Sequence, residues 1–468
     1  MREKFNYYPW QIRHFLGYQA LSRQEERPVV AITQSSLEVE EGDLFVALRG
    51  KRDGHDYLAE AFHKKAQLAI VEKDHPHLNK LGKEERTRLI EVNDTLKALG
   101  QLALSHRRRF SPIVVAVTGS SGKTTTKELL ATIRHVMPEG TVVYSAKNYN
   151  NEIGVPFTLF RINEKTRLAI LELAMNHGGE IERLSLMTKP DIAVITTLGE
   201  AHIEFLGSEK NIAHAKSEIF AGMQKHSQFF IPRSTSRKKI PISLARNLGL
   251  HVHETGFGLE GDILKIREER ADGFELDLLG EPFFFPLPGK ILLENVALAA
   301  SVLLFLGFSP REIAQAFGKF QGEEHRLKIY HGDYVVIDDT YNSNPTGVKA
   351  AVSAALQLAG PKDCYAVLGD FRELGRFSLK YHKETGIFLA QTTLKDLITF
   401  GEDSFYLGQA FAKRRKNVLW QHFPNSPLEI DKLVARVKNT VPLGSVILVK
   451  GSRALLMERI VERLREHP

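Results

Sequence analysis

Short runs of apolar residues give the first 109 residues the pattern of a small α/β unit. Four runs have the length and composition of strands, at 28–33, 43–48, 68–72 and 88–92. The segment 95–109 instead repeats its apolar residues at helical spacing, so it predicts a helix that closes the unit. A boundary therefore falls near residue 109.

From Ser111 onward the apolar runs lengthen and alternate with helical segments. The runs at 113–118, 168–173 and 191–197 are continuously apolar, which is typical of parallel strands covered on both faces. The stretch 251–287 is more β-like, and 292–308 reads as a buried helix that ends at Gly307. A third α/β unit begins near Tyr330, with strands expected at 334–339, 365–370, 396–400 and 445–450.

Composition changes this picture little. The 468 residues are 43% hydrophobic and 25% charged, which is ordinary for globular domains, and the one cysteine, Cys364, reads as a core residue. Net charge is +7 but spread out, and we interpret its one tight cluster, 106–110, as a solvated linker rather than a nucleic-acid patch. No signal peptide and no apolar stretch of about 18 residues is evident, so we expect a cytoplasmic monomer with no nucleic-acid or membrane partner.

The residues after the first strand of the middle unit have the pattern of a phosphate loop. Gly119, Ser120, Ser121, Gly122, Lys123, Thr124 and Thr125 lie between a buried strand and a helix. Glycines let backbone N–H groups converge on an anion at the start of a helix. Lys123 can reach the β- and γ-phosphates, and the Thr124 hydroxyl can bind Mg²⁺. The two glycines are closer together than in the usual P-loop, however.

Three more polar residues follow the next strands of the same sheet. Glu172 lies at the carboxyl end of one strand and His202 just beyond the next, where open parallel sheets bind ligands. With the loop on a neighbouring strand, a metal-ligand role for Glu172 is favoured over a surface role. Lys216 follows on a helix, and its spacing alone favours an ordinary surface lysine.

The order of these segments resembles the Mur ligases, which are ATP-dependent. The shared motifs are TGSSGKTTTKE, KNYNNEIGVP, LELAMNHGGEI, GEAHIEFLGS, AKSEIF, DDTYNSNP, LGDFRELG and ILVKGSR. In YNSNP (341–345) the chain is most similar to members that add D-alanyl-D-alanine to UDP-N-acetylmuramoyl-tripeptide. The diaminopimelate-adding members carry an Ala-His segment there and an Asp-Asn-Pro-Arg motif, and this chain has neither.

The resemblance implies a fold and a domain division. It implies three α/β domains: a small N-terminal one, a central P-loop-type mostly parallel sheet with flanking helices, and a Rossmann-like C-terminal one. The implied ranges are 1–109 for UDP-muramoyl substrate binding, 110–325 for ATP binding and 326–468 for the ligase domain.

The resemblance also implies a role for each site residue. Lys123 and the loop hold the ATP phosphates, and two Mg²⁺ ions are held by Thr124, Glu172, His202 and Lys216, the last as a carbamate. Asn295 is expected against adenine, and Arg326 and Asp339 are expected to reach ATP from the third domain. The expected substrate contacts are Ser35, Asn150, Asn151 and Asn344.

The implied reaction phosphorylates a carboxylate, and the amine of D-alanyl-D-alanine then attacks the acyl phosphate.

Three departures from the family pattern affect details of the site. Ile291-Leu292 replace a His-Asn pair, Gln34-Ser35-Ser36 replace an Asp-Ser-Arg triplet, and His325-Arg326 replace a Gly-Arg pair. The alternatives are another Mur-type amino-acid ligase, a P-loop kinase or NTPase, and a binding protein that has lost catalysis. The retained Lys123, Glu172, His202 and Lys216 count against the last.

Overall fold

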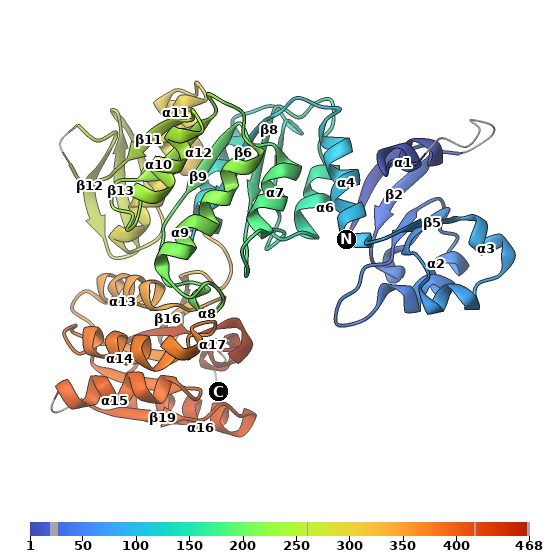
Figure 1. The fold of residues 1–468 in the computed structure, drawn as a ribbon. Coiled ribbons are helices and arrows are strands. Elements are labelled where there is room, and N and C mark those ends of the chain that lie inside the picture. Colours follow the sequence, from blue (N-terminus) through green and yellow to red (C-terminus); the bar gives the residue numbers. More distant parts are fainter. Residues whose placement is uncertain (19–26, 260, 416–417, 466–468) are drawn as a thin grey trace.

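The structure, a computed structural model, describes residues 1–18, 27–259, 261–415 and 418–465. The chain forms three α/β domains (Figure 1), as the sequence predicts, with strands β1–β5 in the first, β6–β14 in the second and β15–β20 in the third. In the described ranges, none of the helices combines the length and apolar character needed to span a bilayer.

The N-terminal domain is a five-stranded sheet in the order β1-β2-β3-β4-β5, parallel except for β1, which runs antiparallel to β2. Leu68 and Ile70 face one apolar core and Ala69 and Val71 another, so β4 is buried on both faces. The elements are β1 (Arg2–Tyr7), α1 (Pro9–Phe15), β2 (Val29–Thr33), β3 (Leu44–Val46), α2 (Leu58–His63), β4 (Leu68–Glu72), α3 (Lys83–Thr87), β5 (Leu89–Val92) and α4 (Thr95–Arg107).

The central domain is built on a six-stranded, fully parallel sheet in the order β11-β10-β9-β6-β8-β7. Residues of β6 alternate between two cores, so helices cover both faces, with α6, α7, α9 and α10 on one face and α5, α11 and α12 on the other. The strands are β6 (Ile113–Thr118), β7 (Val142–Tyr144), β8 (Leu168–Glu172), β9 (Ile192–Ile195), β10 (Gln228–Pro232) and β11 (His251–Thr255).

A separate three-stranded antiparallel sheet, β12-β13-β14, packs its apolar side against α12 and the core around α11. It accounts for the β-like stretch that the sequence shows before residue 287. The remaining elements of the domain are α5 (Lys123–Ala131), α6 (Gly154–Phe160), α7 (Glu180–Thr188), α8 (Ile203–Leu206), α9 (Glu209–Ser217), α10 (Lys239–Asn247), β12 (Leu264–Arg270), β13 (Gly273–Leu278), β14 (Glu281–Phe285), α11 (Leu293–Phe305) and α12 (Pro310–Phe317).

The C-terminal domain is a six-stranded sheet in the order β15-β16-β20-β17-β18-β19, parallel except for β15. The residues of β20 alternate between a core under α13, α14 and α15 and a core under α16 and α17. The elements are β15 (Lys328–His331), β16 (Val335–Asp339), α13 (Pro345–Ala359), β17 (Cys364–Gly369), α14 (Ser378–Leu389), β18 (Asp396–Phe400), α15 (Ser404–Arg414), β19 (Trp420–Phe423), α16 (Pro427–Thr440), β20 (Val446–Lys450) and α17 (Glu458–Arg465).

Two predictions about local structure need correction. The segment 106–110 is not a solvated linker, because His106 and Arg107 are buried at the end of α4. His106 bonds the Tyr7 hydroxyl at 2.7 Å and the Ile162 carbonyl at 2.8 Å, which ties the N-terminal domain to the central one. The helix expected at 292–308 is α11, which ends at Phe305, two residues before Gly307.

Candidate active site

The loop between β6 and α5 needs both of its glycines. Gly119 has φ +149°, and a Cβ there would lie 2.0 Å from Thr196 Oγ1. Gly122 has φ +80°, and a Cβ there would lie 2.5 Å from Asn295 Oδ1. The Ser120 amide donates to the Thr197 carbonyl at 2.8 Å, which holds the loop against the end of β9.

After this anchor the loop leads into α5, and the backbone amides at the start of that helix are hydrogen-bond donors. The first amides of a helix have no carbonyl within that helix, and they carry partial positive charge. Lys123 extends back over the loop, and its Nζ donates to the Gly119 carbonyl at 2.8 Å. Burial lowers the pKa of Lys123, Arg326 lowers it further, and Glu172 opposes both effects. The loop thus combines a cation with convergent donors, as an anionic phosphate requires.

Glu172 and Lys216 are buried beside this loop, each with an atom left without a hydrogen bond. Glu172 ends β8 and is 2% exposed, and its Oε1 accepts from Asn150 Nδ2 at 2.8 Å, whereas Oε2 has no partner among the described residues. Lys216 on α9 is 0% exposed, and its Nζ likewise has none. The surface-lysine interpretation of Lys216 is therefore wrong.

Burial lowers the pKa of Lys216 well below its usual value, and the charge of Lys123 lowers it further. The carboxylates of Glu218, Glu172 and Glu180 act in the opposite direction. A buried amine with this environment is readily deprotonated. Together, the unpartnered carboxylate oxygen and the neutral amine form a donor set that suits a cation or a modified lysine.

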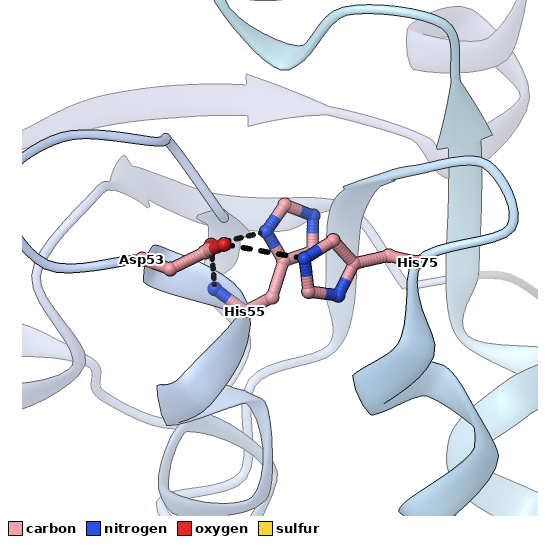
Figure 2. A group of neighbouring side chains, drawn as sticks. All are labelled: Asp53, His55 and His75. Carbon is pink, nitrogen blue, oxygen red and sulfur yellow. Dashed lines mark hydrogen bonds and ion pairs between the residues drawn. The ribbon is translucent and has the colours of Figure 1, made fainter.

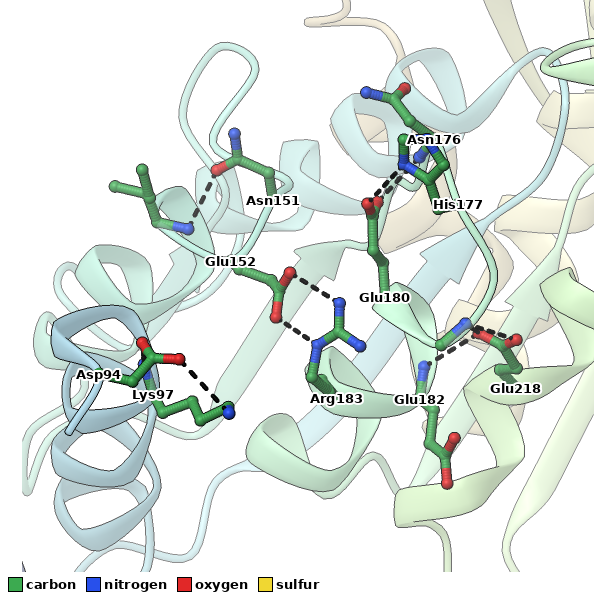
Figure 3. Close-up of polar contacts among 12 residues, drawn as sticks. Asp94, Lys97, Asn151, Glu152, Asn176, His177, Glu180, Glu182, Arg183 and Glu218 are labelled. Carbon is green, nitrogen blue, oxygen red and sulfur yellow. Dashed lines mark hydrogen bonds and ion pairs between the residues drawn. The ribbon is translucent and has the colours of Figure 1, made fainter. Parts of the chain in front are cut away.

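Two carboxylates hold the loop that follows β8: Glu180 at the start of α7 and Glu218 just after α9 (Figure 3). Glu180 accepts the Asn176 amide at 2.8 Å, and Glu218 accepts the Gly179 amide at 2.8 Å and 2.9 Å through its two oxygens. Arg183 on α7 pairs with Glu152 at 2.5 Å and 3.0 Å. These contacts fix the backbone that follows Glu172 and tie it to Glu218, two residues after Lys216.

His202 lies in the loop after β9, as predicted, and meets a residue that the sequence analysis did not assign. Its Nδ1 is 2.6 Å from Oε2 of Glu373, in the C-terminal domain. Burial lowers the pKa of His202, although Glu373 opposes this effect. Glu373 belongs to the motif LGDFRELG, so the motif was recognised while the role of this residue was missed.

Other C-terminal residues reach the loop directly or lie near it. Asn344 caps α13 by accepting the Gly347 amide at 2.7 Å, and its Nδ2 donates to Ser121 Oγ at 3.1 Å. Arg326 stacks 4.0 Å above the Tyr341 ring, and Asp339 pairs with Lys450 at 2.7 Å. The structure therefore brings Asn344 onto the phosphate loop and gives Asp339 a lysine partner.

Asn295 and the neighbouring departures lie on the other side of the loop. The buried side chain of Asn295 on α11 accepts from Thr126 Oγ1 at 3.3 Å. Ile291 is exposed, whereas Leu292 packs against both the central and the C-terminal cores. In place of the expected His-Asn pair, the chain thus has one interdomain apolar contact.

Within the described residues, the side chains of two predicted substrate contacts, Asn151 and Ser35, form no hydrogen bond with this cluster. Asn151 Oδ1 accepts the Gly154 amide at 2.9 Å and so starts α6. Ser35 lies in the N-terminal domain, where its amide donates to Thr33 Oγ1 at 3.1 Å. Beside it, Ser36 is buried, and its hydroxyl donates to Glu60 Oε2 at 2.9 Å.

The N-terminal domain also groups Asp53, His55 and His75 closely enough to suggest a metal site (Figure 2). The Glu72 amide donates to His55 Nε2 at 2.9 Å, so Nδ1 carries the proton and donates to Asp53 Oδ1 at 2.6 Å. His75 Nε2 contacts Asp53 Oδ2 at 3.2 Å. Burial alone would raise the pKa of Asp53, but bonds from His55 and His75 lower it to about 2. A metal on His55 Nδ1 would place a proton on Nε2 against the Glu72 N–H, so the group is a closed hydrogen-bonded network.

Family models match the chain in all three domains. Residues 28–107 match the Mur ligase family catalytic domain, 117–303 the Mur ligase middle domain and 325–453 the Mur ligase glutamate ligase domain. The chain belongs to the Mur ligase family. The phosphate loop, Glu172, His202 and Lys216 all lie within the middle-domain match.

Relatives of this Mur ligase extend along nearly its whole length. The UDP-N-acetylmuramoyl-tripeptide–D-alanyl-D-alanine ligase of Bacillus subtilis is 30% identical over 97% of this chain and 96% of its own. The ligase of the same name from Escherichia coli is 30% identical over 93% of this chain and 94% of its own. The Synechocystis ligase of that name is 33% identical over 90% of this chain and 89% of its own.

Solved structures agree with this placement among the Mur ligases. A crystal structure of MurF from Acinetobacter baumannii superposes with a TM-score of 0.84 at 28% identity, covering 99% of this chain and 100% of that chain. MurF ligase from Thermotoga maritima in complex with ADP gives a TM-score of 0.78 at 26% identity, covering 93% and 96%.

Proposed function

We propose that this Mur ligase uses ATP to join D-alanyl-D-alanine to UDP-N-acetylmuramoyl-tripeptide in peptidoglycan precursor synthesis. The observation that carries the proposal is the pair of buried residues Glu172 and Lys216 beside a glycine loop with the half-buried Lys123, and with His202 at the edge of the group. Relatives that cover nearly the whole chain bear this activity as their name. A related structure in complex with ADP supports nucleotide binding.

In this proposal the chain first holds the triphosphate. The loop amides and Lys123 bind the β- and γ-phosphates, Asn295 lies against adenine, and Arg326 and Asp339 approach ATP from the C-terminal domain. The tripeptide carboxylate attacks the γ-phosphorus, so that ADP leaves and an acyl phosphate forms. Lys123 offsets the repulsion between the two anions as they approach.

In the second step the amine of D-alanyl-D-alanine attacks the acyl carbon. The tetrahedral intermediate collapses with loss of inorganic phosphate, and an amide remains. Phosphate is a far better leaving group than an oxide ion, which is why the first step is required. Neither step needs a nucleophilic side chain, because the protein positions two substrates and stabilises charge.

The residues present fit two Mg²⁺ ions. Glu172 Oε2 is buried without a partner, and Thr124 is a buried hydroxyl at the start of α5. Thr124, Glu172, His202 and Lys216 would hold the ions, with Lys216 as a carbamate. When bound, Mg²⁺ supplies positive charge between the triphosphate and the attacking carboxylate.

The carbamate is proposed because Lys216 is buried and unpartnered. A neutral amine adds CO₂ and releases one proton, so a cationic side chain becomes an anionic oxygen ligand. The lowered pKa of Lys216 supplies the neutral amine that this addition requires.

We assign residues 1–109 to the UDP-muramoyl substrate, 110–325 to ATP and 326–468 to the ligase domain. Ser35, Asn150, Asn151 and Asn344 are the proposed substrate contacts. Asn150 is supported by its bond to Glu172, and Asn344 by its bond to Ser121. Because ATP and UDP-linked precursors are cytoplasmic compounds, we place the reaction in the cytoplasm.

Phosphate release tests the proposal. With ATP and UDP-N-acetylmuramoyl-tripeptide, addition of D-alanyl-D-alanine should start stoichiometric release of phosphate and formation of the pentapeptide, seen by mass spectrometry. Diaminopimelate or glutamate in its place should give no product. Product with either amino acid would favour another Mur-type ligase, and phosphate release without any acceptor would favour a plain NTPase.

A further inference from the structure

The contact between His202 and Glu373 joins two strained backbone positions across a domain interface. His202 has φ +66° and Glu373 has φ +64°, a region that residues with a side chain rarely adopt. The Glu204 amide donates to the Glu373 carbonyl at 3.1 Å, so the two loops are held by backbone as well as side chains. A Cβ on Gly375 would lie 2.8 Å from Glu204 Cγ, which shows how closely the loops approach.

The geometry at the histidine leaves one ring nitrogen for another partner. Nδ1 lies 2.6 Å from Glu373 Oε2, so the carboxylate favours a proton on Nδ1 and leaves the lone pair on Nε2. A histidine that binds a metal through one nitrogen ordinarily donates the other N–H to such a carboxylate.

We propose that Glu373 is a positioning residue, delivered by the C-terminal domain, that orients His202 so that Nε2 faces the cation site. The inference rests on the proposed function, which assigns His202 to that site. It adds a residue that the sequence analysis did not assign, and it couples the placement of the C-terminal domain to metal binding in the central one.

Other contacts hold the two domains together without Glu373. Thr346 Oγ1 donates to Glu200 Oε2 at 2.9 Å, Asn344 donates to Ser121 at 3.1 Å, and the Gly289 amide donates to Gln357 Oε1 at 2.9 Å. Substituting Glu373 therefore removes the partner of His202 while it leaves most of the interface in place.

The test measures metal binding rather than turnover. Mn²⁺ and β,γ-methylene-ATP are titrated into the full-length protein and free Mn²⁺ is followed by electron paramagnetic resonance. We compare wild type with Glu373→Ala, Glu373→Gln, His202→Ala and the double variant Glu373→Ala/His202→Ala. Glu384→Gln, an exposed change on α14 of the same domain, is the matched control.

Of the two Mn²⁺ ions, the one bound more weakly should bind about 10- to 100-fold less tightly to Glu373→Ala than to wild type. This is the usual effect of losing a carboxylate partner of a metal-binding histidine. Glu373→Gln, whose amide oxygen can still accept from Nδ1, should retain part of that affinity. In the His202→Ala background, the Glu373→Ala change should have no further effect.

Two results would overturn the inference in different ways. If His202→Ala weakens Mn²⁺ binding but Glu373→Ala does not, Glu373 is only an interdomain contact, and the proposed function stands. If His202→Ala binds both Mn²⁺ ions as tightly as wild type, the metal role of His202 in the proposed function fails, and the inference fails with it.

Discussion

Lys216 shows how burial changes the chemistry of a side chain. Its amine is fully buried near Lys123 and has no hydrogen-bond partner among the described residues. A protonated amine in that place would be both desolvated and repelled, so burial lowers the pKa of Lys216 well below its usual value. The side chain therefore has the nucleophilicity of a free amine.

Lys216→Arg should be as inactive as Lys216→Ala, because a guanidinium keeps its charge and cannot form a carbamate. Acetate or propionate should restore part of the activity of Lys216→Ala by supplying the missing carboxylate. Ligation assays with and without the acid measure both effects. Lys210→Arg, an exposed position on the same helix, is the control, and wild-type turnover in Lys216→Arg would falsify the carbamate.

Lys123→Ala should lower activity by at least about 100-fold while leaving the circular dichroism spectrum unchanged. The reason is the loss of a charge-assisted contact to the β- and γ-phosphates, worth roughly 1.5–3 kcal/mol in binding and more in the transition state. The exposed change Lys239→Ala provides the comparison. If Lys123→Ala turned over ATP at a near-normal rate, the phosphates would have to bind elsewhere.

At this scale the sequence predicted residue types better than environments. Lys123 and Glu172 could be placed because a loop and a strand end define them locally. Spacing alone favoured a surface position for Lys216, because one turn of α9 does not show what packs over it. Its environment includes residues distant in sequence, such as Glu172 at the end of β8, whose charge acts on the amine.

At the scale of elements, α5 and the linker before β15 share a buried charged group. Lys127 on α5 pairs with Glu128, and its Nζ is 3.7 Å from Oε1 of Glu323 in the linker. Burial and the neighbouring Glu128 raise the pKa of Glu323 to about 7, although Lys127 opposes both. The phosphate-loop helix is thereby tied to the segment that leads into Arg326.

The pKa of Glu323 makes stability depend on pH. The folded chain keeps a proton on this carboxyl between about pH 4.5 and 7 that the unfolded chain has lost, so the free energy of unfolding falls as pH rises through that window. Glu323→Gln removes this dependence, so it should be about 1–3 kcal/mol more stable than wild type at pH 8 and no more stable at pH 4. Urea titrations at both pH values measure this.

The control for this experiment is Glu324→Gln, because Glu324 is the exposed neighbour of Glu323. It should change the urea midpoint equally little at either pH. A Glu323→Gln variant that follows the wild-type pH dependence would show that another group titrates.

The strands in the middle of each sheet were predictable from sequence, whereas several at or near the edges were not. Runs such as Val114–Val117 are buried on both faces and so are continuously apolar. The strands β1, β7, β15 and β19 lie at sheet edges, are short or mixed in polarity, and pair on one side only. Their pairing with a buried neighbour, rather than their own pattern, makes them strands.

At the scale of the molecule, the candidate site is completed from a different domain. Ser121 meets Asn344 and His202 meets Glu373, pairs that are 223 and 171 residues apart. Periodicity carries no information on such pairs, and the family resemblance pointed to Asn344 but assigned no role to Glu373. The phosphate loop, Glu172 and His202 could be predicted because they lie at or beyond the carboxyl ends of β6, β8 and β9, which are neighbours.

The apolar core that runs from the N-terminal sheet into the central domain has a calorimetric consequence. Phe5 packs edge-on against Phe160, with 5.0 Å between the ring centroids, and α4 packs against α6 and α7. One cluster of buried residues includes members of both the N-terminal and the central domain. The C-terminal domain shares much less apolar surface with its neighbour, mainly through Ile203, Ile212 and Leu292. Since cooperative melting follows shared burial, a heat-capacity scan should resolve two transitions from these three domains, the larger one being joint melting of the first two. Three separate transitions would show that the seam at α4 is too weak to couple them.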